Sequence, residues 1–340
     1  MLTSRNQDGQ ATAFGAGHCP GPPPDLPYLA RLAAVDFQPV FILGEPRSGT
    51  TILYQALGMS GCFNLLTAYH VLCYDRILAD HIQRMVRTTK QQINDYLATR
   101  NIRTRQFDNL RVSADYTVEY HMVLRNRRHE MALSPGCLDV FDELCRKVQF
   151  AGARDQPLLL KNPRDFDRFL YIRSVYPRSK FIFIHRHPIQ VLDSQLKLLR
   201  SLFIERNPLL EILLKDYARL HRFGLARVLA RILLSPSAPL HLPRTLGVRR
   251  LLRRRAYYRR HVGQLPAEAY ITLRYEDFCA DPQRSVEQVL HFLGLQPRQA
   301  VDYRAMIERR PRKLEPDVES VQERLCRQFG CGPEENDYTP

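Results

Sequence analysis

The stretch from Pro39 to Tyr54 constrains the fold of this chain more than any other. An apolar run, Pro39 to Leu43, predicts a buried strand, and a turn of small and polar residues, Gly44 to Gly49, follows it. A helical pattern then begins at Thr50. A strand, a glycine-bearing turn and a helix start direct backbone N–H groups and the positive end of the helix dipole at one point. The stretch therefore predicts an anion-binding loop.

This loop departs at one position from the nucleotide-binding P-loop pattern G-x-x-x-x-G-K-[ST]. Gly44 and Gly49 have the required spacing, and Thr51 fills the final position. The lysine position holds Thr50, and Arg47 supplies a positive charge from inside the loop. We expect the loop to hold phosphate. The missing lysine, which would reach a β/γ-phosphate pair, disfavours NTP hydrolysis and kinase chemistry.

The rest of the chain alternates strand and helix patterns. The strand from Lys180 to His185 is apolar almost throughout, which is typical of a parallel sheet buried on both faces. The alternation predicts an α/β fold with a doubly wound central parallel sheet flanked by helices, and ligands in such folds bind at the carboxyl edge of the strands. Strands are expected at 38–44, 157–161, 180–185 and 269–273, a short extended segment at 62–68, and helices at 50–58, 71–87, 90–99, 116–126, 138–149, 165–175, 189–202 and 282–293.

Length and composition predict one domain over residues 28–330, within a chain of 340 residues. The proline-rich segment 1–27 is expected to be a disordered leader, and 331–340 a flexible tail. The chain has 8 cysteines, scattered and without metal-ligand spacing, which indicates reduced thiols. No segment has the apolar length of a signal peptide or a spanning helix, so we expect a cytoplasmic protein.

The net charge of +15 is concentrated in one region. Residues 217–267 contain twelve arginines and no acidic residue. This region lies in an expected helical insertion at about 201–266, a basic cap over the carboxyl edge of the sheet, which is also rich in leucine. Three uses fit: an apolar acceptor pocket, a homodimer interface, or peripheral contact with an anionic membrane. Core-packing leucines beside a solvated arginine face fit equally well, whereas nucleic-acid binding is disfavoured because no nucleic-acid motif accompanies the arginines.

A second motif follows the strand that ends at His185. Arg186 stands at its carboxyl end, Pro188 suits the first turn of a helix, and Ser194 lies eight residues after the arginine. An arginine and a hydroxyl at that edge are suited to a phosphate.

Together these motifs resemble the PAPS-dependent sulfotransferase family, in its prokaryotic-type branch (PAPS is 3′-phosphoadenylyl sulfate). Pro46-Arg-Ser-Gly-Thr-Thr51 is similar to the family's 5′-phosphosulfate loop, and Arg186-x-Pro188 with Ser194 to its 3′-phosphate motif. Tyr275-Glu-Asp-Phe-x3-Pro282, followed by Phe292-Leu-Gly-Leu295, resembles a structural signature of the same family. The matches occur in the family's order over residues 39–295.

The resemblance implies transfer of a sulfuryl group from PAPS to a hydroxyl or amine of an acceptor, with PAP released and no metal required. The acceptor is expected to be a small molecule, hydrophobic or lipid-like. A basic run, Arg309 to Lys313, stands where relatives close a loop over the 3′-phosphate, but it lacks the loop's glycine and equally fits a solvated turn. The residues that the resemblance assigns to the cofactor are Arg47, Ser48, Gly49, Thr50, Thr51, Arg186, Ser194 and Arg312.

The general base is the open position of the site. Some relatives carry a histidine two residues after the lysine of a segment that Leu159-Leu-Lys-Asn-Pro163 resembles, but here that position is Pro163. His70, 23 residues beyond Arg47, is one candidate base, and a histidine that caps the following helix is the alternative. Glu119 is the rival candidate for the base, and the alternative interpretation of this residue is a carboxylate exposed to solvent on a helix. Lys161 is expected to stabilise the sulfonate. The alternative interpretation is that Lys161 only forms an ion pair at the end of its strand.

Two other functions compete with sulfuryl transfer. A P-loop-type kinase or NTPase would require Mg²⁺ and ATP, and the missing lysine argues against it. A non-catalytic protein that keeps the nucleotide fold and docks on an anionic membrane or polyanion is the third hypothesis, because the usual histidine of the family is absent. Binding of PAP separates the first hypothesis from the second, and turnover separates it from the third.

Overall fold

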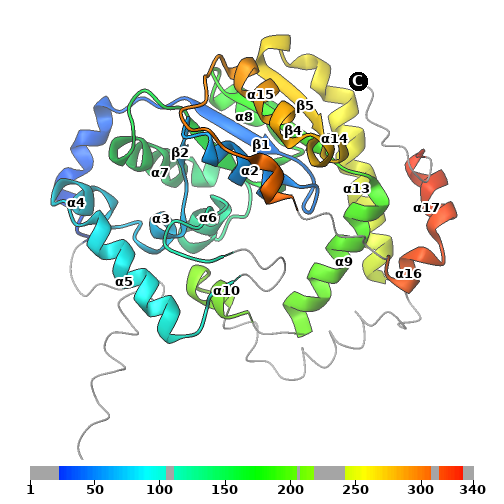
Figure 1. Ribbon diagram of the computed structural model, residues 1–340, viewed down its shortest axis with the longest axis horizontal. Coiled ribbons are helices and arrows are strands. Elements are labelled where there is room, and N and C mark those ends of the chain that lie inside the picture. The colour runs from blue at the N-terminus through cyan, green and yellow to red at the C-terminus, as the bar shows by residue number, and fades with distance from the viewer. Residues whose placement is uncertain (1–22, 105–110, 205–206, 218–241, 308–313, 332–340) are drawn as a thin grey trace, which may run out of the picture. The chain divides into compact units, whose positions relative to one another are not determined.

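The computed structural model describes residues 23–104, 111–204, 207–217, 242–307 and 314–331 (Figure 1). The chain divides into two compact units. Unit 1 comprises Met1–Gln38, Asn64–Leu160 and Arg206–Arg222, and unit 2 comprises Pro39–Phe63, Lys161–Glu205 and Phe223–Pro340.

Unit 1 is largely helical. Its elements are a 3-10 helix at Leu26–Ala34, β2 (Asn64–Leu65), α3 (Ala68–Leu72), α4 (Ile77–Ile82), α5 (Val86–Thr99), α6 (His121–Arg128), a 3-10 turn at Pro135–Cys137, α7 (Leu138–Ala151), β3 (Leu158–Lys161), whose last residue belongs to unit 2, and α10 (Pro208–Leu213).

Unit 2 contains the other strands and the anion-binding loop. Its elements are β1 (Pro39–Leu43), α2 (Thr50–Met59), a 3-10 turn at Pro163–Asp165, α8 (Phe169–Val175), β4 (Lys180–His185), α9 (Pro188–Ile204), α13 (Leu242–His261), 3-10 turns at Val262–Gln264 and Ala267–Ala269, β5 (Tyr270–Arg274), α14 (Tyr275–Ala280), α15 (Pro282–Leu293), a 3-10 turn at Tyr303–Met306, α16 (Pro316–Glu319) and α17 (Gln322–Phe329).

The strands form a parallel sheet in the order β2-β3-β1-β4-β5, which confirms the predicted α/β class. Within unit 2, Val40 of β1 is level with Lys180 of β4, and Phe181 of β4 is level with Tyr270 of β5. Every residue of β1 is buried, and so is β4 after its first residue. Burial on both faces explains why these two strands have apolar sequences without alternation.

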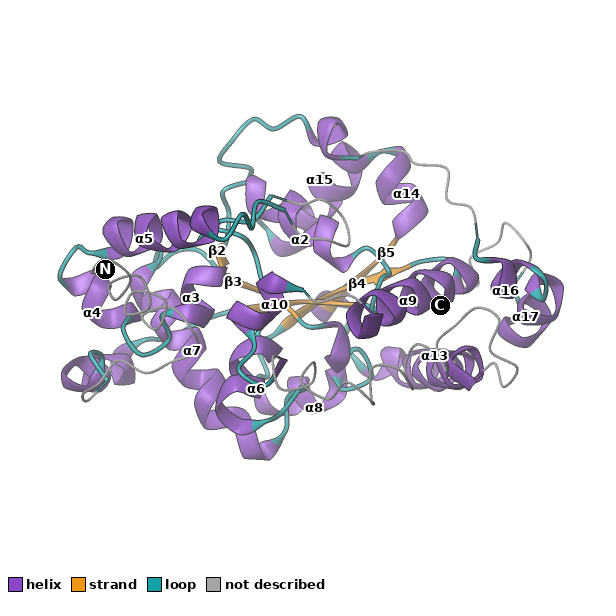
Figure 2. Cartoon of the chain, turned by 90° about the horizontal axis from the view of Figure 1, so that it is seen from below, coloured by secondary structure: helices purple, strands orange, loops and turns teal. Residues whose placement is uncertain are grey.

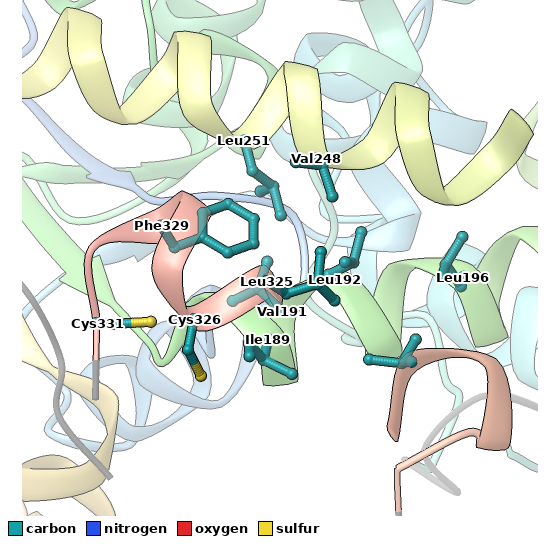
Figure 3. Packing of buried hydrophobic residues seen from close by; sticks show 11 residues of the cluster. Ile189, Val191, Leu192, Leu196, Val248, Leu251, Leu325, Cys326, Phe329 and Cys331 are labelled. Carbon is teal, nitrogen blue, oxygen red and sulfur yellow. The ribbon is translucent and has the colours of Figure 1, made fainter. Parts of the chain in front are cut away.

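Helix α9, which carries Ser194, is held in unit 2 by a cluster of buried apolar side chains. Figure 2 shows α9 and α13 side by side, and Figure 3 shows that α17 contributes to the same cluster. Leu192 of α9, Leu251 of α13 and Phe329 of α17 are among its members. Burying a side chain of this size stabilises a fold by about 1.5–3 kcal/mol. The cluster therefore fixes α9 from two sides.

Two predicted helices of unit 1 are wrong in extent. The segment 71–87 forms no single helix: α3 ends at Leu72, α4 spans Ile77–Ile82, and Arg84, with a left-handed φ of 59°, separates α4 from α5. Residues at 116–120 are not helical, because the Val118 N–H donates to the Leu66 carbonyl and Thr117 forms an antiparallel bridge with Thr67. The helix expected there begins only at His121.

The predicted cap is helical where it is described. Its described helices are α10 and α13, in addition to the end of α9. The leucines of α10 that are buried, Leu209 and Leu213, are part of the packed interior. Residues 218–241, the leader up to residue 22, the basic run 308–313 with Arg312, and the tail from 332 lie outside the described residues.

Candidate functional site

The predicted anion-binding loop connects β1 to α2. The Ser48 N–H donates to the Glu45 carbonyl over 2.9 Å, and this turn holds Arg47 at a φ of 75°. Gly49 is the N-cap of α2 with a φ of 105°. Glycine adopts this φ without strain, whereas the left-handed backbone of Arg47 is strained, as residues of ligand-binding sites often are. The N–H groups at a helix start attract anions.

The loop is packed so closely that two of its positions have no room for a side chain. A Cβ atom on Gly44 would lie 2.5 Å from the Ile184 carbonyl, and one on Gly49 would lie 2.3 Å from the ring of Tyr275. The hydroxyl of Ser48 is fully buried and makes no hydrogen bond within the described residues. A buried donor in this position is suited to an anionic ligand, because an unsatisfied hydroxyl is otherwise costly.

Lys161, the last residue of β3, supplies a cation to this loop from a different strand. Its ammonium donates to the Thr51 hydroxyl over 2.8 Å, and the side chain is only 2% exposed. In a nucleotide-binding P-loop the corresponding hydroxyl contacts Mg²⁺. Here an ammonium group stands beside that oxygen, and the repulsion between two cations opposes a metal at the same place. Lys161 thus brings a second positive charge to the loop, in addition to Arg47, and its hydrogen bond to Thr51 is a contact that the sequence alone does not specify.

Arg186 and Ser194 are also next to the loop. The guanidinium of Arg186 donates through Nε and Nη2 to the Gln190 side-chain oxygen, over 3.1 and 2.7 Å, and lies 4.3 Å from the centroid of the Tyr275 ring. Ser194, on α9, accepts a hydrogen bond of 3.0 Å from Nε of Arg47. This bond joins the two motifs that the sequence separates by 147 residues. Among the described residues, unit 2 therefore brings together all the predicted cofactor residues.

Sequence reasoning missed four residues around these groups: Glu45 and Arg255 are buried, Tyr275 is half-buried, and Gln190 is exposed. Glu45 and Arg255 form an ion pair in which Arg255 Nε and Nη2 donate to the two carboxylate oxygens over 2.9 and 3.1 Å. Gln190 and Tyr275 contact Arg186, and the sequence analysis does not place either of them in the binding site. Gln190 lies in the first turn of α9, whereas Arg186 precedes that helix, so no helical spacing in the sequence indicates their contact.

Comparison with known proteins decides the family. The family model described as "Sulfotransferase family" matches residues 39–233, more than half of the chain, and this range includes the loop, Lys161, Arg186 and Ser194. The chain belongs to the sulfotransferase family. It is therefore an enzyme of the transferase class by family. The comparison with curated protein sequences gave no match.

Two solved structures show that this sulfotransferase shares the fold of bacterial members. Sulfotransferase STF1 from Mycobacterium tuberculosis is 15% identical, with a TM-score of 0.55 over 90% of this chain and 80% of that one. Sulfotransferase STF9 from Mycobacterium avium is 14% identical, with a TM-score of 0.53 over 93% of this chain and 73% of that one. At these identities the likeness concerns the fold.

His70 of this sulfotransferase lies in unit 1, where its ring accepts a hydrogen bond that caps a helix. It forms a capping box with Thr67, whose backbone N–H donates to His70 Nδ1 over 3.0 Å at the start of α3. Because Nδ1 accepts this bond, Nε2 carries the proton of the neutral ring. Burial, followed by the nearby Lys90 ammonium, lowers the pKa of His70 to about 3, so the ring is neutral near pH 7. This geometry is that of a cap, and the role as general base stays a prediction.

Glu119, the rival base, also lies in unit 1, just before α6. Its carboxylate is 3.0 Å from Nδ1 of His121, and its side chain is 21% exposed. A carboxylate in this setting is an acceptor with access to solvent, which is compatible with proton transfer. Its catalytic role likewise stays a prediction.

Several absences apply to the described part of the chain only. There, no helix combines the length and apolar character that crossing a bilayer requires. Those same residues contain no group of three or more His, Cys, Asp or Glu side chains arranged to hold a metal ion, and the expectation of metal-free chemistry stays a prediction. All cysteines within the described ranges are free thiols, whereas Cys19 lies outside them.

Proposed function

We propose that this sulfotransferase moves the sulfuryl group of PAPS to a hydroxyl or amine of an acceptor and releases PAP. The observation that carries the proposal is the 3.0 Å hydrogen bond between Arg47 and Ser194. It joins a loop suited to a 5′-phosphosulfate to a helix suited to a 3′-phosphate. PAP carries a phosphate at each of these positions, so one nucleotide would engage both motifs at once.

The residues present fit such a donor. The Ser48 hydroxyl, buried and without a hydrogen bond within the described residues, would donate to a phosphate oxygen. Thr50 and Thr51 at the start of α2 would add backbone N–H groups, and Arg186 would bind the 3′-phosphate through its guanidinium. The ammonium of Lys161 beside Thr51 supports transfer without a metal over the kinase or NTPase alternative.

The reaction forms a bond from the acceptor oxygen or nitrogen to sulfur and breaks the bond from sulfur to the 5′-phosphate oxygen. The electron pair of the broken bond stays on that phosphate, and the acceptor proton moves to a base. Arg47 and Lys161 would stabilise the charge that develops on the sulfonate and on the leaving phosphate, as fixed cations do in phosphoryl transfer. The base would be His70 or Glu119.

For the acceptor we propose a hydrophobic or lipid-like molecule, because the cap is rich in leucine. Contact with an anionic membrane is proposed for the exposed side of α13, where Arg249, Arg250 and Arg260 reach solvent. Arginines near such a surface contribute about 1 kcal/mol each. Replacing these three by glutamine should then reduce sedimentation with phosphatidylserine vesicles but not with phosphatidylcholine vesicles. The homodimer remains a prediction that analytical ultracentrifugation would test.

The experiment that tests the donor is thermal stability with PAP, PAPS, ATP and Mg-ATP. We expect PAP and PAPS to raise the melting temperature and ATP to have little effect. Arg47→Ala should abolish the response to PAP, whereas the exposed Arg284→Ala, on α15 of the same unit, should preserve it. A rise with Mg-ATP alone would establish the kinase alternative. Stabilisation by PAP without any sulfate transfer across a panel of alcohols, phenols, amines and glycolipids would favour the non-catalytic alternative.

A further inference from the structure

Helix α13 contains three consecutive arginines that have different surroundings. The side chain of Arg253 is 75% exposed. Arg254 and Arg255 are buried within unit 2. Successive helical residues point about 100° apart, so one helix can expose an arginine and bury the next two. Burying two guanidinium groups is costly unless each is hydrogen-bonded, and both of these are.

Arg255 connects two strand ends. Its fork donates to both oxygens of Glu45, and Nη2 also donates to the backbone carbonyl of Arg186 over 2.8 Å. The side chains of Arg255 and Glu45 are only 3% and 0% exposed. Glu45 lies in the loop after β1, two residues before Arg47, and Arg186 follows β4. One guanidinium therefore fixes the backbone beside both phosphate-binding arginines.

Arg254 holds the third strand end. It donates through Nη1 to the carbonyl of Pro163 over 3.2 Å and through Nη2 to the carbonyl of Arg164 over 3.4 Å. The carboxylate of Asp167 lies 3.5 Å from Nε of Arg254. Pro163 and Arg164 form the turn that begins two residues after Lys161. Arg254 therefore fixes the exit of the strand that carries the catalytic lysine candidate.

We infer that Arg254 and Arg255 are positioning residues for the donor nucleotide. They hold the ends of β3, β1 and β4 so that Lys161, Arg47 and Arg186 converge on one ligand. Three cations in one site repel each other, and the left-handed backbone of Arg47 is strained, so the arrangement requires support from outside. Because Glu45 neutralises Arg255, this arginine can fix the positions of the binding groups without adding a further net positive charge to the site. The inference rests on the proposed function.

The test compares Arg255→Lys with Arg253→Lys on the same helix. Lysine keeps the charge opposite Glu45, so the variant avoids an unpaired buried carboxylate, but it cannot reproduce the three-bond fork. Calorimetry well below the melting temperatures would measure the Kd for PAP and for 5′-AMP, which lacks the 3′-phosphate. Since small misplacements cost up to about 100-fold, we expect Arg255→Lys to weaken PAP binding about 10- to 100-fold and to bring the two affinities closer together. Arg253→Lys should bind PAP like the wild type.

Arg254→Lys should act through Lys161, and we therefore expect kcat to fall more than the affinity for PAP. If Arg255→Lys does not fold, Glu45→Asp offers the same test, because it keeps the negative charge opposite Arg255 but shortens the side chain that accepts its two hydrogen bonds. Variants that fold with a lower melting temperature but bind PAP and turn over like the wild type would show a purely structural role and overturn the inference. A wild type that does not bind PAP would overturn the proposed function, and the inference with it.

Discussion

Replacing Gly49 by alanine should lower the free energy of unfolding for two reasons, both of which the phosphate loop avoids by having a glycine at the start of α2. The first cost is conformational, because Gly49 has a φ of 105°, which residues with a side chain rarely adopt. The second is steric, because the new Cβ would lie 2.3 and 2.8 Å from two ring carbons of Tyr275. The ring also supports the Arg186 guanidinium, 4.3 Å from its centroid.

The magnitude follows from these two contributions. A non-glycine residue in a sparsely populated backbone region costs about 1–3 kcal/mol. Inserting a methyl group into a closely packed site costs typically about 1–3 kcal/mol more. We therefore expect Gly49→Ala to lower the free energy of unfolding by about 2–6 kcal/mol. If the ring moves to relieve the overlap, Arg186 loses its aromatic contact, so PAP binding should weaken too.

Two other glycines of unit 2 provide matched controls for urea unfolding. Gly294 has a φ of 69° at the end of α15, but a Cβ there would meet nothing within 4 Å. Gly294→Ala should therefore show the conformational cost alone, about 1–2 kcal/mol. Gly263 has open space around it and no left-handed φ, so Gly263→Ala should leave stability unchanged or slightly raised.

A double variant identifies the ring as the obstacle. In a Tyr275→Ala background the steric part should vanish, so that Gly49→Ala costs about as much as Gly294→Ala. The reasoning is refuted if Gly49→Ala is no more destabilising than Gly294→Ala in the wild-type background, or if the cost of Gly49→Ala is independent of Tyr275.

Three further predictions concern the reacting groups. Lys161→Met keeps the length of the side chain but removes its charge, and we expect kcat to fall about 10²- to 10³-fold, as measured by PAP release, because a fixed donor to the developing charge is lost. Folding lowers the pKa of His70 from 6.5 to about 3, so between these two pH values the unfolded chain binds a proton at His70 and the folded chain does not. The free energy of unfolding is therefore highest above about pH 6.5 and decreases as the pH falls towards about 3, by up to about 2 kcal/mol between pH 7 and 5. In His70→Asn, whose side-chain oxygen can accept the hydrogen bond from the Thr67 N–H, the melting temperature should depend less on pH over this range. Glu119→Gln should lower kcat more than His70→Asn does, and a drop of about 10²- to 10⁴-fold in His70→Asn with normal PAP binding would instead identify His70 as the base.

The sequence predicts those parts of the site in which the chemistry is local. The strand β1, the turn and the start of α2 lie within one short stretch, and β4 is followed directly by Arg186. Both patterns depend on apolar runs and on glycine and proline positions, which are visible without a structure. The predicted residues of these two motifs do come together in unit 2.

The rest depends on long-range packing. The hydrogen bond from Lys161 to Thr51 forms because β3 lies beside β1 in the sheet. The sequence predicts the individual strands but not their order in the sheet. The arginines of α13 occur on every side of the helix, so no periodicity distinguishes the buried Arg255 from the exposed Arg253. The interruption of the expected helix 71–87 depends on the left-handed backbone of Arg84, a residue type that seldom adopts it.

The buried pair of Glu45 and Arg255 has a consequence for exchanging parts between relatives. An insertion between the end of α9 and β5 looks like a module that can be replaced to change acceptor preference. In this protein, however, replacing α13 would remove the partner of a carboxylate inside the phosphate loop, and an uncompensated buried charge typically costs about 3–5 kcal/mol. A chimera with a foreign insertion should therefore regain its stability only when the residue at position 45 is exchanged together with the insertion. The two segments must be transferred together, although they lie 210 residues apart in the sequence.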